Sequence, residues 1–308
     1  MSVEPPASGR LLDRAAEAAA VREVIEDLGI PGIIDVHVHF MPENVMAKVW
    51  DYFDRQGPLV ARAWPIVYKV PIETRVAILE ELSVLRYSGL AYPHRPDMAK
   101  WLNDWTLEFA RTHTRCAPSA TFYPEEGAPA YVEEALEGGA KIFKAHVQVG
   151  GYDPRDKRLD DVWRILERAK VPVVIHCGSA PVAGSHTGVE PIEEVLRRFP
   201  ELTLVIAHMG NDEYEGFVDL AERFSRVHLD TTMVFTPFNE AMSPYPRDLL
   251  PRLGALEDRV VFGSDFPNIP YNFVEQVKGI AGLDLPRRWK QRVCYDNPLA
   301  LIGLIASE

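Results

Sequence analysis

The sequence of 308 residues has little cysteine, no excess of positive charge and no long apolar run. Its three cysteines, Cys116, Cys177 and Cys294, lie far apart and form no CxxC pair, which favours a reduced, cytoplasmic setting. No run is long enough to span a membrane, and the N-terminus lacks the apolar core of a signal peptide. The net charge of −12 argues against partners such as nucleic acid or an anionic membrane, which require a basic surface.

The chain also lacks a Pro/Gly/Ser linker, a charge run or a low-complexity block that would divide it. Its length suits one large α/β barrel or two ordinary domains. Residues 1–10 read as a flexible arm, and residues 11–28 read as a helix that ends at Gly29. We therefore expect an N-terminal arm and helix over residues 1–30, followed by a single domain over residues 31–308.

What the chain does contain is a repeated alternation of short β-branched runs with helical segments. Eight strands that alternate with helices predict parallel pairing and, at this length, a closed (β/α)8 TIM barrel of the α/β class. A doubly wound open sheet is the alternative. The predicted strands cover 32–40, 84–92, 116–124, 141–149, 171–179, 202–210, 227–235 and 260–268. The predicted helices after the first cover 97–112, 128–138, 159–169, 189–199, 212–224, 246–254, 271–281, 286–294 and 297–305, and the segment 43–53 is also predicted to be helical.

Histidines and an aspartate stand near the ends of four predicted strands. The run "IIDVHVHF" carries His37 and His39, whose i, i+2 spacing turns both side chains to the same side. The fifth run carries His176, the sixth His208 and the eighth Asp265. Each residue alone has a structural alternative, such as a strand-end hydrogen bond or a helix cap. Because strand ends converge on one face of a barrel, the set predicts a divalent metal site, with zinc favoured.

Two further groups are expected to bind substrate from the fourth predicted strand. Lys144 and His146 are also spaced i, i+2, so both are predicted to face the interior. Residues 56–73 read as a long loop, a kind of segment that often forms a lid or binding loop. Arg62 lies in that loop and is a candidate to hold a substrate carboxylate.

The ordered motifs "DVHVHF", "FKAH", "VIHCGS", "VIAHMG", "GSDFP" and "DNPLALIG" resemble the amidohydrolase superfamily. More narrowly, they resemble the amidohydrolase-related branch that includes aminocarboxymuconate semialdehyde decarboxylase, over roughly residues 32–305. The resemblance implies that His37, His39 and His176 are metal ligands. It implies that Asp265 is a further ligand or a proton-handling carboxylate beside the metal.

The resemblance leaves the number of ions open. It implies that His208 lies close to the metal, where it orients water and substrate or binds a second ion. Some branches carry a carboxylated lysine that bridges two ions, and Lys144 is the matching position. The other readings of Lys144 are a partner for a substrate carboxylate, which we favour together with one ion, and a structural ion pair.

We expect a metal-dependent hydrolase that activates water on a divalent ion and cleaves an amide, ester or lactone bond. The substrate would be a small, carboxylate-bearing organic molecule, and a homo-oligomer is compatible with the sequence. The enzymatic alternative is non-oxidative decarboxylation of an unsaturated or aromatic acid, because the same ligands serve both reactions. The non-enzymatic alternative is a barrel without catalysis that serves as a binding or assembly module.

Overall fold

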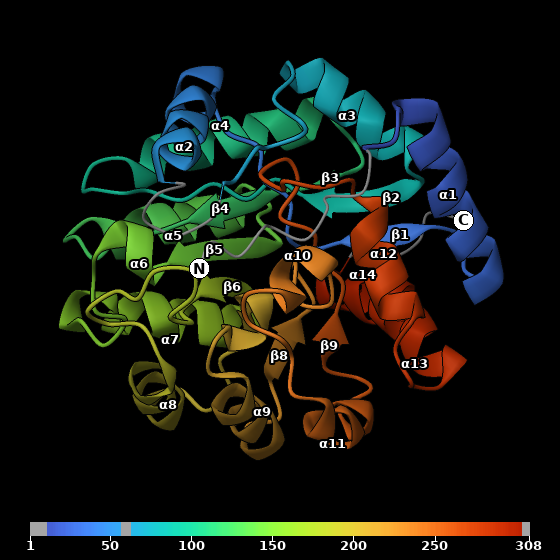
Figure 1. The fold of residues 1–308 in the computed structure, drawn as a ribbon. Helices are drawn as coiled ribbons and strands as arrows, with labels where there is room; N and C mark the ends of the chain where they lie inside the picture. The colour runs from blue at the N-terminus through green and yellow to red at the C-terminus, as the bar shows by residue number, and fades with distance from the viewer. Residues whose placement is uncertain (1–10, 57–62, 304–308) are drawn as a thin grey trace.

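The structure, a computed structural model, describes residues 11–56 and 63–303, so the arm expected over residues 1–10 lies outside it. Parallel strands alternate with helices, and the helices surround the strands (Figure 1). The strands are β1 (Ile33–Asp35), β2 (Val84–Ser88), β3 (Cys116–Ala117), β4 (Ser119–Thr121), β5 (Ile142–His146), β6 (Val173–His176), β7 (Leu204–Ile206), β8 (Val227–Asp230) and β9 (Val260–Val261).

Helix α1 (Arg14–Leu28) precedes β1, and the other helices lie between the strands or after them in chain order. They are α2 (Glu43–Gln56), α3 (Ile72–Glu81), α4 (Ala99–Thr112), α5 (Ala128–Glu137), α6 (Val147–Gly150), α7 (Asp160–Ala169), α8 (Val189–Arg198), α9 (Tyr214–Arg223), α10 (Pro237–Glu240), α11 (Leu250–Ala255), α12 (Val274–Ala281), α13 (Arg287–Gln291) and α14 (Asn297–Leu301). Among the described residues, no helix combines the length and the apolarity needed to cross a membrane.

Hydrogen bonds join the strands into a ring. One sheet has the order β1-β2-β3, and the other runs from β4 to β9 in sequence order, with every pair parallel. The Val36 N–H donates to the Phe262 carbonyl at 3.1 Å, and the His39 N–H donates to the Phe266 carbonyl at 2.7 Å. These bonds connect the first unit to the last. The predicted (β/α)8 barrel with an N-terminal helix is confirmed, and the open doubly wound sheet is not adopted.

Several elements differ from the sequence-based expectation, among them α6, which replaces the end of the predicted strand 141–149, and α10, which was not predicted. The third predicted strand, 116–124, is divided at Pro118, so β3 pairs with β2 while β4 pairs with β5. Proline has no N–H to donate to a strand ladder, which explains the break at this residue. Helix α3 was not among the predicted helices, because its first residues were assigned to the loop over 56–73.

The core has three clusters, of which the two that involve the strands position the site. A large cluster fills the space between the strands and the surrounding helices. A smaller cluster includes Ile142 from β5 and Val174 from β6. Lys144 and His176 follow these residues at i+2 and therefore share their face of the strands. The small cluster thus forms an apolar floor, and the polar side chains lie above it towards the carboxyl ends of the strands.

Helix α1 supports this end of the barrel from outside. Its N-terminus is capped by Asp13, whose carboxylate accepts the Ala16 N–H at 2.9 Å, and Gly29 ends it with a φ of 68°. Glu17 is buried against α12 and accepts the Tyr68 hydroxyl at 2.6 Å. The helix therefore packs on the barrel and contacts the segment that leads into α3.

Candidate metal centre

The first two histidines of the site follow β1. His37 and His39 are almost fully buried, at 0% and 3% exposure, and their rings lie 5.1 Å apart between centroids. The chain after β1 is held on both sides, since the Leu90 N–H donates to the Val38 carbonyl at 2.8 Å and the Asp265 N–H donates to the His37 carbonyl at 2.8 Å. The i, i+2 spacing thus presents both imidazoles from a fixed backbone.

Hydrogen bonds determine which nitrogen of each ring carries the proton. His37 Nδ1 lies 2.8 Å from an oxygen of Asp230, and His39 Nδ1 lies 3.0 Å from the Leu90 carbonyl oxygen. An ionised carboxylate and a carbonyl only accept, so both Nδ1 atoms must donate. Both Nε2 atoms are therefore unprotonated and carry a lone pair. This is the arrangement that supports metal-binding histidines, in which the second nitrogen is fixed by an outer acceptor.

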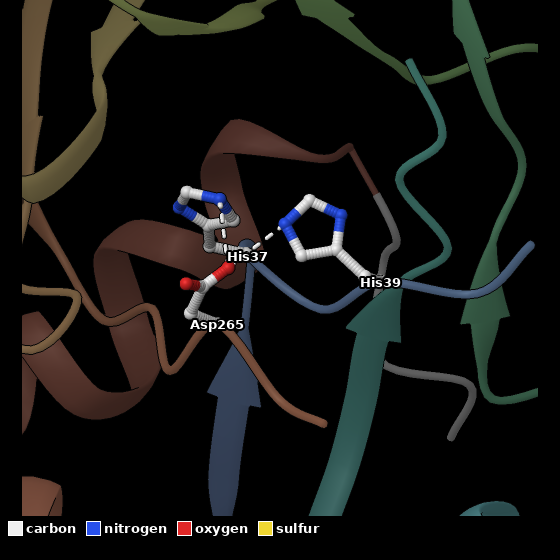
Figure 2. Close-up of side chains that lie close together, drawn as sticks. All are labelled: His37, His39 and Asp265. Atoms are coloured by element: carbon white, nitrogen blue, oxygen red, sulfur yellow. Dashed lines mark ion pairs between the residues drawn. The ribbon is translucent and has the colours of Figure 1, made fainter. Parts of the chain in front are cut away.

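Asp265 brings a carboxylate to the same point. One of its oxygens lies 2.9 Å from His39 Nε2 and 3.7 Å from His37 Nε2 (Figure 2). The ligand atoms of the three residues all lie within 4.8 Å of one another. Burial raises the pKa of Asp265, but the contacts with the surrounding histidines outweigh burial and hold the pKa well below its ordinary value. The carboxylate is therefore ionised.

The loop after β9 is built to place this carboxylate. Asp265 has a φ of 66°, a left-handed conformation that costs energy for a residue with a side chain. At Gly263 an added Cβ would lie 2.7 Å from the His37 Cβ, so only glycine fits there without displacing the histidine. The strained conformation of Asp265 and the lack of space for a side chain at Gly263 bring this loop close to His37, and this places the Asp265 carboxylate beside the histidines.

The lone pairs of His37, His39 and Asp265 converge on one point and fit a divalent cation. With both Nε2 atoms unprotonated, His39 and Asp265 face each other at 2.9 Å as two acceptors, a contact that requires a proton or a cation. Two imidazole nitrogens and one carboxylate oxygen form a donor set that suits zinc, and also iron, manganese or cobalt. The residues present therefore fit a metal ion.

His176 and His208 lie beside these three residues. The ring of His208 is 5.3 Å from that of His37 and 4.9 Å from that of His176. His208 follows β7 with a φ of 55°, and its Nδ1 lies 3.2 Å from the Thr232 carbonyl oxygen, which makes Nδ1 the donor. Burial is the largest cause that lowers the pKa of His208, so the ring is neutral and its Nε2 has a free lone pair. A donor role for that atom would require protonation.

His146 has the opposite tautomer to His208. Its Nδ1 accepts the Val149 N–H at 3.3 Å, so the neutral ring carries its proton on Nε2. Burial, followed by the charge of His176, lowers the pKa of His146 well below its ordinary value. The ring stacks on His176 at 4.1 Å with an interplanar angle of 13°. His146 is therefore a hydrogen-bond donor beside the site rather than a further free lone pair.

Lys144 enters the site from β5. Its side chain is fully buried, and Nζ lies 2.9 Å from His37 Nε2, to which it donates. Burial lowers the pKa of Lys144 to about 8, and the nearby Asp265 and Asp230 oppose that effect. The sequence placed Lys144 in the interior and matched it to a bridging lysine near the metal, but it did not predict a hydrogen bond from the free amine to His37.

A cavity of about 1690 Å³ opens over these residues. Pockets for small molecules commonly measure about 300–1,000 Å³, so this one accepts more than a very small ligand. Its walls include the aromatic side chains of Trp64, Tyr92 and Trp101, together with the cations Lys48 and Arg95. In residues 11–56 and 63–303, neither of these cations has an acidic partner at ion-pair distance. The predicted substrate residue Arg62 lies outside the described residues.

The sequence reading missed Asp230, which connects several parts of the site. One oxygen of Asp230 accepts a hydrogen bond from His37 Nδ1, while the other accepts the backbone N–H of His208 at 2.8 Å and of Thr232 at 3.1 Å. Asp230 ends β8 in the structure, but the predicted strand extends to residue 235, so Asp230 did not stand at a predicted strand end. Lys48 and Arg95 also carry no signal in the sequence, because exposed cations in loops and helices are common.

Comparison with known proteins agrees with this fold and site. A sequence model described as amidohydrolase matches residues 34–304. No curated protein matches the chain significantly. Among solved structures, an uncharacterised TIM-barrel protein from Bordetella bronchiseptica has 19% identity and a TM-score of 0.68, covering 88% of this chain and 98% of its own.

Two other solved structures are decarboxylases. A 5-carboxyvanillate decarboxylase from Novosphingobium aromaticivorans, complexed with manganese, has 14% identity and a TM-score of 0.64, covering 90% of this chain and 97% of its own. A 2,6-dihydroxybenzoate decarboxylase from Rhizobium has 16% identity and a TM-score of 0.62, covering 89% of this chain and 99% of its own. At these identities the likeness shows the fold.

The fold and the site together define a (β/α)8 barrel with a candidate centre for a divalent metal at the carboxyl ends of its strands. The match over residues 34–304 adds the family: the chain belongs to the amidohydrolase family. The resemblance expected from the sequence motifs is therefore confirmed, whereas the roles of the individual site residues stay predictions.

Proposed function

We propose that the protein is a metal-dependent hydrolase that cleaves an amide, ester or lactone bond of a carboxylate-bearing substrate. His37, His39 and Asp265 hold one divalent ion, zinc in the first instance, and His176 completes its coordination. The observation that carries the proposal is the convergence of three ligand atoms within 4.8 Å, with both imidazole protons fixed on the far nitrogens. One ion needs no ligand beyond these, whereas a second would require a carboxylated Lys144.

The reaction follows from the protonation states of the residues around the ion. When bound, the ion would polarise the carbonyl of the substrate and lower the pKa of a water molecule. Asp265, ionised and 13% exposed, accepts the proton of the attacking water and passes it to the leaving group. His208 has its Nε2 lone pair free and orients the water as an acceptor. His146 donates from Nε2 to a substrate oxygen, as its tautomer requires.

The cavity supports a substrate that combines an organic acid with an apolar body. Lys48 and Arg95 are cations on the cavity wall of a protein with net charge −12. Each of these cations attracts an anionic substrate despite the overall charge, and Asp97 and Asp212 on the same wall limit this effect to the part of the cavity near the cations. Trp64 and Tyr92 offer aromatic surface to the rest of the molecule. Arg62, from the long loop, stays a predicted further contact for the carboxylate.

Non-oxidative decarboxylation is the second candidate. The ammonium of Lys144 lies beside the ligand atoms and is suited to hold a carboxylate next to the ion. Two of the structural neighbours named above are decarboxylases of aromatic acids. Both reactions need the same ion and the same carboxylate pocket, so they differ in which bond of the bound acid breaks.

A substrate screen with two readouts tests both candidates. Zinc-loaded and manganese-loaded protein is incubated with lactones, esters and amides that carry a carboxylate, and with aromatic and unsaturated carboxylic acids. Hydrolysis is followed by acid release, and decarboxylation by CO2 release. We expect metal-dependent hydrolysis that Asp265→Asn strongly reduces. CO2 release without hydrolysis would establish the second candidate, and inactivity of the loaded protein on all these compounds would support the non-catalytic binding module.

A further inference from the structure

Lys144 is unusual among the buried groups of this protein. Its side chain is fully buried, yet no carboxylate lies within ion-pair distance of Nζ in the described parts of the chain. The hydrogen bond of 2.9 Å to His37 Nε2 is the only one that Nζ makes there. A buried ammonium normally requires a close anionic partner. Here its partner is the atom that we assign as a metal ligand.

The hydrogen bond and a metal bond exclude each other at this atom. Asp230 holds the proton of His37 on Nδ1 at 2.8 Å, so Nε2 has a single lone pair. That lone pair accepts either an N–H of Lys144 or an ion at about 2.0–2.1 Å. The two cations would also repel each other inside a site with little solvent. Ion binding therefore requires Lys144 Nζ to leave His37.

We propose that Lys144 is an internal competitor for the metal ion. In the metal-free protein its ammonium occupies the His37 lone pair and supplies positive charge beside Asp265. When the ion binds, the amine is displaced into the cavity that Lys144 also lines. This inference rests on the metal centre of the proposed function, and it goes beyond it in two respects. The ion binds more weakly than its ligands alone would allow, and the displaced ammonium becomes available to the substrate carboxylate.

The affinity for zinc measures this competition directly. Metal-free protein is prepared by dialysis against a chelator, and the Kd for zinc is determined by chelator competition at one fixed pH. Lys144→Met removes the amine at similar volume, and Lys144→Gln keeps an N–H donor without charge. We expect the Kd to fall at least tenfold in Lys144→Met and by less in Lys144→Gln. Circular dichroism verifies that each variant is folded.

Lys141→Met provides a matched control. Lys141 immediately precedes β5 and is exposed, so this variant changes the net charge equally without touching the site. Its Kd should equal that of the wild type. An unchanged Kd in both Lys144 variants would overturn the proposal. A weaker affinity would also overturn it, because Lys144 would then contribute a ligand, as a carboxylated lysine does.

Zinc binding by the wild-type protein distinguishes a failure of the proposed metal centre from a failure of this inference. If wild-type protein and both Lys144 variants bind no zinc, the metal centre itself is wrong, and the proposed function fails with the inference. If wild-type protein binds zinc, only the competition is in question. Crystal structures of wild-type protein without and with zinc decide it independently of any variant. The contact between Nζ and His37 should be present in the first and lost in the second, and its persistence beside a bound ion would refute the competition.

Discussion

Asp230→Asn should weaken metal binding without altering any proposed ligand. The carboxylate of Asp230 keeps the proton of His37 on Nδ1 through a contact of 2.8 Å. Asparagine can still accept the N–H groups of His208 and Thr232 with its carbonyl oxygen. Its NH2 group then faces His37 Nδ1, where two donors would meet. The imidazole relieves this clash by moving its proton to Nε2, which removes the lone pair that we assign to the ion.

The magnitude follows from what is lost. A hydrogen bond to a charged group contributes about 1.5–3 kcal/mol, and loss of such an outer partner typically lowers metal affinity by about 10- to 100-fold. We therefore expect the Kd for zinc to rise by about that factor in Asp230→Asn, measured by chelator competition on folded protein. Asp219→Asn, on the surface of α9 beside Arg252, is the matched control and should leave the Kd unchanged. An unchanged Kd in Asp230→Asn would refute the assignment of His37 as a ligand through Nε2.

Three other changes test separate parts of the structure. His37→Ala combined with His39→Ala should leave a folded barrel that retains no stoichiometric zinc, and full occupancy by elemental analysis would show that the ligands are misassigned. Asp265→Asn, with activity normalised to metal content, should lower kcat on the order of 100-fold or more with a smaller change in KM, and near-normal turnover would exclude its role in proton transfer. His228 is not among the proposed site residues, and burial is the main cause that lowers its pKa to about 4. Between about pH 6.5 and pH 4, His228 is protonated in the unfolded chain but neutral in the folded chain. The free energy of unfolding therefore decreases as the pH falls through this range, by about 2 kcal/mol at pH 5. His228→Gln should therefore lose less stability than wild type between pH 7 and pH 5 in urea titrations, and equal losses would contradict the burial effect.

The local parts of the site could be predicted because they depend on spacing. His37 and His39 lie two residues apart on an extended segment, and this spacing places both rings on one side in any barrel of this kind. The strand-end positions of His176 and Asp265 follow from the alternation of strands and helices in the same way. The fold and the candidate ligands can thus be predicted from sequence periodicity, because neither prediction requires knowledge of side-chain contacts.

The remaining features depend on contacts across the barrel that spacing does not encode. Lys144 on β5 reaches His37 after β1, although these strands are not neighbours in the sheet. The tautomer of His37 depends on Asp230 from a third strand, and the cations Lys48 and Arg95 reach the cavity from segments outside the strands. Such contacts become visible only when the ring of strands is closed.

The most direct test of the metal centre is anomalous X-ray diffraction at the zinc edge from crystals of zinc-loaded protein. We predict one ion per chain, about 2.0–2.2 Å from His37 Nε2, His39 Nε2 and a carboxylate oxygen of Asp265. An ion bound away from these three atoms, or an anomalous map without a peak between them, would contradict the centre on which the proposed function depends.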